Sequence, residues 1–187
     1  GSDAGEYAII PEGAKAANYA ITFLPGTLTV GQRTATLKWD GYDERTYDGT
    51  ASNVTATVTN KIDNDDVTVT VTGGDAVNAG TYTATVAGLA GVKAKNYQLP
   101  ETGLTQSYTI NRAELAIASV AVEGKTYDGT TDAKVTNVTF SGLKNNEELV
   151  AGTDYTVAGV FDKADVGTRT ATVTVTMKDT AKAKNYQ

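Results

Sequence analysis

The sequence predicts an all-β fold of tandem antiparallel β-sandwich modules, broadly immunoglobulin-like and arranged in an elongated array. Three stretches alternate threonine with an apolar residue, at Val54–Thr59, Val67–Thr72 and Ala171–Thr176. A period of two puts the apolar side chains on one face of a strand and the hydroxyls on the other, as a half-buried antiparallel strand requires. Clusters of Gly, Asn and Asp at residues 72–81 and 87–96 separate such stretches and indicate turns.

Long helices are not expected, because β-branched residues favour strands and no segment of useful length repeats its apolar residues with a helical period. A β-grasp-like module is the alternative fold. It requires a long amphipathic helix, which the sequence does not show. In the stretch TLKWD, alternation predicts that Leu37 and Trp39 point inward while Lys38 points to solvent.

Three short motifs recur in the same order and divide the chain into modules. RTYDGT at 45–50 returns as KTYDGT at 125–130, NAGTYTATV at 78–86 returns as DVGTRTATV at 165–173, and KAKNYQ occurs at 93–98 and 182–187. Residues 1–30 carry related endings, DAGEYAI and KAANYAI. We therefore predict the C-terminal strands of a preceding module at 1–30, one module at 31–111, and a second at 112–187 that lacks its last strand.

Composition excludes several classes of function. The 187 residues include 22 acidic and 16 basic side chains, for a net charge of −6, which argues against binding nucleic acid or an anionic membrane. With no cysteine and no histidine, the chain has no disulfide, no thiolate nucleophile and no common zinc site. No apolar run has the length of a membrane span. We predict a protein that is not an enzyme, needs no cofactor and does not insert into a membrane.

The TYDGT motif has a structural and a functional interpretation. Asp-Gly is a strong turn dipeptide, because Asp accepts hydrogen bonds from nearby backbone N–H groups and Gly tolerates positive φ. The tyrosine would then pack over the end of its module while its hydroxyl binds a backbone group. The alternative is a ligand contact. The residues concerned are Tyr47, Asp48, Gly49, Tyr127, Asp128 and Gly129.

The repeat-closing motif allows the same two interpretations. The favoured one is that Asn96 and Asn185 satisfy a loop backbone while Tyr97 and Tyr186 pack into the core, because packing explains recurrence among varying neighbours. The alternative is a surface that stacks on a glycan and hydrogen-bonds it through the amide. The residues are Asn18, Tyr19, Asn96, Tyr97, Asn185 and Tyr186.

A calcium site is a further candidate, since Asn60 and Asp63–Asp66 gather oxygen ligands in one loop. The spacing lacks the alternating ligands of a calcium-binding loop, and no equivalent acidic cluster is expected in the second module. A solvated acidic turn is the preferred interpretation, so no metal site is predicted.

Together, the basic residue before TYDGT, the following AG-T-Y and the closing N-Y resemble the YDG and MBG-type repeats of bacterial surface proteins and adhesins. The resemblance extends over both modules and the N-terminal segment. It implies an extracellular, cell-wall-associated repeat region that acts as the stalk or spacer of an adhesin, with neighbouring repeats as its partners. The alternative is that the repeats themselves bind mucin-type glycans or host surface proteins, weakly per module and tightly through avidity.

Overall fold

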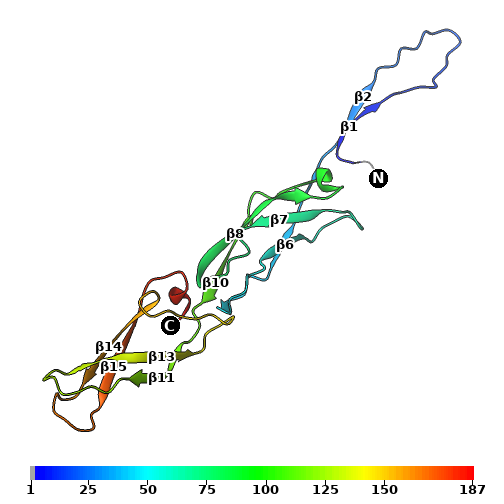
Figure 1. Ribbon diagram of the computed structural model, residues 1–187. Helices are drawn as coiled ribbons and strands as arrows, with labels where there is room; N and C mark the ends of the chain where they lie inside the picture. Colours follow the sequence, from blue (N-terminus) through cyan, green and yellow to red (C-terminus); the bar gives the residue numbers. More distant parts are fainter. Residues whose placement is uncertain (1–2) are drawn as a thin grey trace. The chain divides into compact units, whose positions relative to one another are not determined.

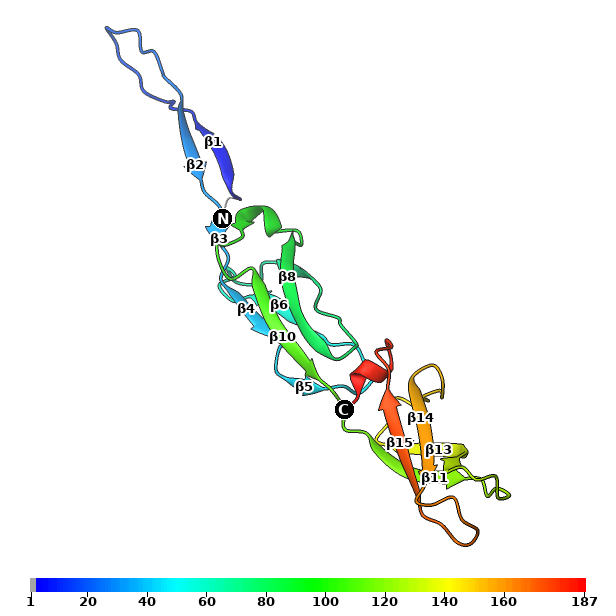
Figure 2. The same cartoon turned by 90° about the vertical axis from the view of Figure 1, so that its left-hand side faces the viewer.

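The computed structural model describes residues 3–187, which form two compact units (Figures 1 and 2). The first unit contains the residues up to Gly41 together with Val54–Gly74 and Thr83–Gln106. The second contains Tyr42–Asn53, Asp75–Tyr82 and Ser107–Gln187. Within the described residues the regular elements are strands and two short 3-10 helices, so the predicted all-β class is confirmed.

The first unit begins with a hairpin, drawn in blue in Figure 1. Strand β1 (Gly5–Ile9) pairs antiparallel with β2 (Gly26–Val30), and Gly5 lies opposite Val30. Nearly every residue of this hairpin is exposed, as is the connecting loop. The hairpin is therefore held by its backbone ladder, with little apolar burial.

The remainder of the first unit is built from short paired strands around one core. β3 (Arg33–Thr34) runs parallel to β9 (Tyr97–Gln98), and β4 (Leu37–Asp40) runs antiparallel to β6 (Thr55–Val58). β7 (Thr68–Thr72) pairs antiparallel with β8 (Gly80–Ala90), and the 3-10 helix η1 (Ala94–Asn96) precedes β9. These elements bury a cluster that contains Ala35, Val58, Val67 and Tyr97, with Leu37, Val69, Leu89 and Ala94 packed against it.

That cluster draws apolar side chains from two separate sheets. Leu37 and Val58 come from β4 and β6, and Val69 and Leu89 come from β7 and β8. The predicted alternation is confirmed in β6, where every second residue is buried. Lys38 is exposed between the partly buried Leu37 and Trp39, and it forms an ion pair with Asp40 at 2.8 Å, as its position in the alternation predicts.

The second unit contains two sheets of its own. β11 (Ala116–Val122) pairs antiparallel with β13 (Val135–Ser141). β12 (Asp132–Ala133), β14 (Tyr155–Phe161) and β15 (Ala171–Met177) form an antiparallel sheet in the order β12-β14-β15. Phe140 and Tyr155 meet edge to face, with ring centroids 5.1 Å apart.

The ends of the second unit carry the residues of the candidate site. β5 (Arg45–Thr46) runs parallel to the end of β10 (Thr105–Asn111), and these strands belong to a sheet in the order β5-β10-β8-β7. The 3-10 helix η2 (Ala183–Asn185) leads into Tyr186, which bridges Ala113 in parallel. In the first unit η1 leads into Tyr97 and β9 in the same way, so the repeated KAKNYQ motif adopts one local structure twice.

Candidate functional site

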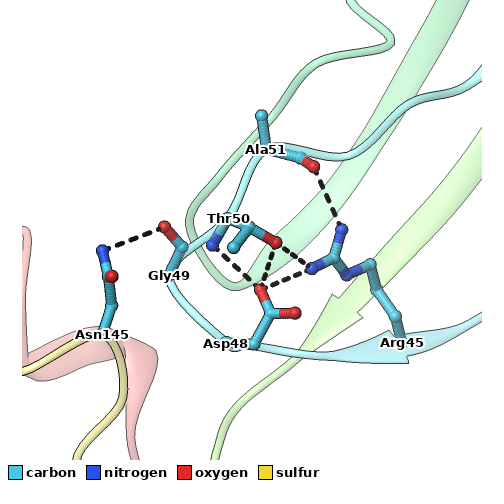
Figure 3. Close-up of polar contacts among 6 residues, drawn as sticks. All are labelled: Arg45, Asp48, Gly49, Thr50, Ala51 and Asn145. Carbon is cyan, nitrogen blue, oxygen red and sulfur yellow. Dashed lines mark hydrogen bonds and ion pairs between the residues drawn. The ribbon is translucent and has the colours of Figure 1, made fainter.

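The first TYDGT motif forms a closed polar turn (Figure 3). Oδ1 of Asp48 accepts hydrogen bonds from Thr50 N at 2.9 Å, from Thr50 Oγ1 at 2.6 Å and from the guanidinium of Arg45. Arg45 also donates to Ala51 O at 3.3 Å. Gly49 has a φ of 79°, a left-handed conformation that glycine adopts without steric cost. Hydrogen bonds from Thr50 and the nearby Arg45 lower the pKa of Asp48.

The second TYDGT motif has the same internal structure. Oδ1 of Asp128 accepts from Thr130 N and from Lys125 Nζ, each at 2.9 Å, and Gly129 has a φ of 75°. Hydrogen bonds from Lys125 and Thr130 lower the pKa of Asp128 to about 2. Arg45 and Lys125 therefore have the same role, because each donates a charged hydrogen bond to the aspartate of its turn. The turn interpretation of both motifs fits this geometry.

The two motif tyrosines lie in opposite environments. Tyr47 is 2% exposed, and its hydroxyl donates to Glu147 Oε1 at 2.6 Å. Its ring meets that of Tyr186 edge to face, with centroids 5.6 Å apart. Tyr127 is 63% exposed. The expectation that both rings pack and both hydroxyls bind backbone was wrong: the ring of Tyr127 is open to solvent, and the partner of Tyr47 is a carboxylate from the next repeat.

Glu147 connects two tyrosines. Its Oε2 accepts a hydrogen bond from the hydroxyl of Tyr186 at 2.6 Å, and that hydroxyl also accepts from Lys144 N at 3.0 Å. Burial, with the hydrogen bond to Glu147, raises the pKa of Tyr186 to about 12 and raises that of Tyr47 as well. Both phenols are thus held in the protonated form that donates to the carboxylate.

The first unit repeats half of this arrangement. The hydroxyl of Tyr97 donates to Asp65 Oδ2 at 2.7 Å and accepts from Ile62 N at 2.8 Å. Asp65 therefore corresponds to Glu147, and Ile62 corresponds to Lys144. Each loop therefore places one carboxylate on the closing tyrosine, although the second module has no acidic cluster like that at Asp63–Asp66.

The acidic loop uses two of its carboxylates inside the fold. Asp65 binds Tyr97, and Asp66 Oδ2 accepts from Val92 N at 3.0 Å. Among residues 3–187 no group of three or more acidic side chains is placed to hold a metal ion. These contacts give the loop a structural role in its own unit.

Asn185, which closes the second copy of the KAKNYQ motif, binds the turn at Asn78 and Ala79 within the second unit. Asn185 is 1% exposed; its Oδ1 accepts from Ala79 N at 2.8 Å, and its Nδ2 donates to Asn78 Oδ1 at 3.0 Å. In the first unit, Asn96 Oδ1 likewise accepts from Ala4 N, and its Nδ2 donates to Asp3 Oδ1, both at 2.8 Å. A loop partner for each asparagine was predicted, and the partner lies in the neighbouring repeat.

The third copy of the closing motif is not packed. Asn18 and Tyr19 lie in the loop between β1 and β2 and are exposed, Tyr19 by 81%. By contrast, Tyr97 and Tyr186 are buried as predicted, at 3% and 4% exposure.

The turns that receive the asparagines are braced from within. The hydroxyl of Tyr7 donates to Asp3 O at 2.7 Å, and the hydroxyl of Tyr82 donates to Asn78 O at 2.9 Å. In the second module Arg169 Nε donates to Asp165 O at 2.8 Å. Arginine at the tyrosine position therefore preserves the hydrogen bond that fixes the turn.

We call this set of contacts the joint. One side of the joint consists of the TYDGT turn at 45–50 and the Asn-Ala-Gly turn at 78–80. The other side consists of the loop that carries Glu147 and the closing residues Asn185 and Tyr186. Sequence reasoning identified the tyrosines and asparagines but missed Glu147, Asn78 and Ala79. The repeated AG turn was visible in the sequence, but nothing in its letters indicates that its backbone N–H is bound by the next repeat.

Comparison with known families confirms the resemblance inferred from these motifs for two parts of the chain. Residues 111–187 match the model of the YDG domain. Residues 1–29 match the model of the MBG domain of the YGX type. No curated protein and no solved structure matches the chain. The matched YDG domain supplies the acidic loop and the Asn-Tyr side of the joint in the second unit.

No helix in residues 3–187 has the length and the apolar character needed to cross a membrane.

The two TYDGT tyrosines provide a matched pair of substitutions. Tyr47→Phe removes a hydrogen bond to a carboxylate, so we expect it to lower the free energy of unfolding by about 1–2 kcal/mol. Tyr127→Phe, at an exposed ring before the same turn of the YDG domain, should change it by less than about 0.5 kcal/mol. Chemical denaturation of both variants measures the difference. Equal effects would contradict the assignment of Tyr47 to the joint.

Alkaline titration should separate the joint tyrosines from an ordinary phenol. Because folding raises the pKa of Tyr47 and Tyr186, their stabilising contribution is complete below about pH 10 and is lost as the pH rises through the folded values. Ultraviolet titration of tyrosinate should show a late phase that includes Tyr186 near pH 12, accompanied by unfolding. If all ten tyrosines ionise together near pH 10, the Glu147 pairings are not present in solution.

Proposed function

We propose that this chain is a run of tandem, immunoglobulin-like β-sandwich modules that extends a bacterial surface protein and holds its adhesive part away from the cell wall. The contact between Asn185 and the Asn78–Ala79 turn carries the proposal, because it joins one repeat to the next through a buried, fully used amide. A related contact joins Asn96 to Asp3 and Ala4 in the first unit. Repetition of one joint is what a spacer requires.

The character of the joint supports a mechanical role. Polar groups at the junction are paired in specific geometry, which favours one relative orientation of the two sides over a freely swivelling linker. Buried polar pairing gives specificity because every displaced group would lose its partner. Residues that a mobile linker would expose, such as Tyr47 and Asn185, are instead 2% and 1% exposed.

The sandwich assignment and the module limits belong to the same proposal. A core that takes side chains from β4 and β6 and also from β7 and β8 supports two sheets facing each other in a module of residues 31–111. Residues 112–187 form the second module, and residues 1–30 form strands of a preceding one. The proposed setting is extracellular and cell-wall associated, and the proposed role is not enzymatic.

Residual dipolar couplings test whether the joint is rigid. We expect residues 42–53 and 75–82 to share one alignment tensor with residues 112–187, because all of them contact one another in the second unit. The variant Asn185→Ala should reduce the couplings of residues 42–53 and 75–82 relative to those of residues 112–187, or the reverse. The variant Asn18→Ala, at the exposed copy of the same motif, should leave the two sets equal. Independent averaging of the two sides in the unmodified chain would contradict the spacer proposal.

Glycan binding is the second candidate function, and one observation favours it. The exposed ring of Tyr127 lies at a groove of about 430 Å³ that is also lined by Lys125 and Arg169. An aromatic face next to cationic donors is suited to stacking on an acidic sugar. Binding to immobilised mucin and to a glycan array, compared with Tyr127→Phe and Tyr127→Ala, tests this candidate. Saturable binding that Tyr127→Ala removes would support it, and no binding at high protein concentration would eliminate it.

A further inference from the structure

In the joint, the turns at Tyr47–Gly49 and Asn78–Gly80 contact residues of the second module. One face of the second module carries a second copy of each of these turns. The TYDGT turn at Tyr127–Gly129 corresponds to Tyr47–Gly49, and the turn at Asp165–Gly167 corresponds to Asn78–Gly80. We call the face formed by Tyr127–Gly129 and Asp165–Gly167 the second socket. Of this face, Tyr127 and Asp165–Gly167 line the groove of about 430 Å³.

The second socket is built but uncovered. Tyr127 and Val166 are 63% and 77% exposed, while Tyr47 is 2% exposed. A Cβ placed on Gly49 would lie 2.5 Å from Asn145 Cβ, whereas a Cβ placed on Gly129 would meet nothing within 4 Å. The first turn is covered by the loop that carries Asn145 and Glu147, and Tyr186 packs on its tyrosine.

Both turns of the second socket hold their shape without an occupant. Asp128 accepts hydrogen bonds from Lys125 and Thr130. Arg169 donates to the backbone oxygens of Asp165 and Val166 at 2.8 and 2.9 Å. A surface that is already ordered loses little conformational entropy when a partner docks. The backbone N–H of Val166 corresponds to that of Ala79, which is bound by Asn185.

Charge identifies the occupant. In the first unit, where an aspartate also begins the turn, Asp3 accepts from Lys93 Nζ at 2.8 Å, from Lys95 Nζ at 2.7 Å and from Asn96 Nδ2 at 2.8 Å. Asp165 occupies the position of Asp3 and is 77% exposed. The sequence that satisfies such a turn is Lys-Ala-Lys-Asn-Tyr, which this chain carries at 93–97 and again at 182–186.

We propose that the second socket is a docking surface for the acidic-loop and Lys-Ala-Lys-Asn-Tyr end of a further YDG module. In that complex the carboxylate of Asp165 accepts hydrogen bonds from the two lysines and from the asparagine amide. The N–H of Val166 donates to the asparagine oxygen, and the hydroxyl of Tyr127 donates to the loop carboxylate. This inference rests on the proposed function and adds the residues and the partner of the next joint.

A substitution within the existing joint tests whether the turn of the second socket can hold the YDG end. The variant Asn78→Asp, Ala79→Val, Tyr82→Arg gives residues 78–82 the sequence of residues 165–169. We expect the amide of residue 79 to stay protected from hydrogen exchange, and Tyr47→Phe to destabilise this variant as it does the unmodified chain. Protection in the unmodified chain with none in the variant would overturn this inference alone. Absence of protection in both would instead remove the proposed function.

A longer chain tests docking directly. Joining a second copy of residues 99–187 after Gln187 restores the order of segments seen after Gln98. We expect hydrogen exchange at the Val166 amide to slow by at least about tenfold, and Tyr127→Phe to become destabilising. Asn185→Ala in the added copy should reverse both effects, and Asn18→Ala should reverse neither.

Two outcomes would overturn the proposal in the longer chain. One is a folded added module, with protected strand amides, that leaves exchange at Val166 unchanged. The other is protection of Tyr127 by mucin glycans with no effect of the added module, which would assign the surface to a glycan. If the added module does not fold, the turn-exchange variant decides the question by itself.

Discussion

Replacing Glu147 by alanine should destabilise the second unit by about 2–4 kcal/mol. The carboxylate accepts hydrogen bonds from Tyr47 and Tyr186, both at 2.6 Å, and both phenols are buried. Hydrogen bonds to a charged acceptor contribute roughly 1.5–3 kcal/mol each, and a buried hydroxyl left without a partner adds a desolvation cost. Denaturant unfolding of the purified variant gives the value.

The adjacent residue supplies the control for this prediction. Glu148 is exposed, and the bond made to it by Lys182 is to its backbone oxygen, so Glu148→Ala should change the free energy of unfolding by less than about 0.5 kcal/mol. Glu147→Gln keeps one acceptor but loses the charge, and it should fall between the two. Comparable losses for Glu147→Ala and Glu148→Ala would mean that net charge, and not the tyrosine pairings, governs stability here.

Replacing Asn185 by alanine should cost about 2–4 kcal/mol and loosen the joint. The amide satisfies Ala79 N and Asn78 Oδ1 at 1% exposure, and it also donates to Ala181 O at 3.3 Å. Each buried group left unpaired costs about 1–3 kcal/mol. Water that enters the space left by the smaller alanine side chain recovers part of that cost. Thermal unfolding should show a fall of roughly 2–4 °C for each kcal/mol.

Two comparison variants separate the asparagine's function from its size. Asn185→Asp keeps the acceptor for Ala79 N but cannot donate to Asn78 Oδ1, so it should also destabilise the joint. Asn18→Ala changes the equivalent motif residue in an exposed loop and should have no measurable effect. Full stability of Asn185→Asp would show that the N–H of Ala79 is the only partner that matters.

Local features of this fold could be predicted because local chemistry determines them. Alternation placed Lys38 in solvent and buried every second residue of β6, since a strand turns successive side chains to opposite faces. The Asp-Gly turns followed from hydrogen bonding within five residues. The burial of Tyr97 and Tyr186 followed from their recurrence in packed repeats.

The joint could not be predicted because its partners are remote in the sequence. Tyr47 and Tyr127 have nearly identical neighbours along the chain but opposite exposure, because Glu147 and Tyr186 cover Tyr47. Asn185 lies 107 residues from Asn78 in the sequence. The motifs themselves contain no information about which remote residues cover them.

Hydrogen exchange at the backbone amide of Ala79 tests the central claim most directly. This N–H lies in a partly exposed turn, and its acceptor is the side chain of Asn185 in the next repeat. We expect protection at Ala79 in the unmodified chain, with exchange faster by at least about tenfold in Asn185→Ala and unchanged in Asn18→Ala. Exchange at Ala79 as fast as at an open loop amide in the unmodified chain would contradict the joint and the spacer function built on it.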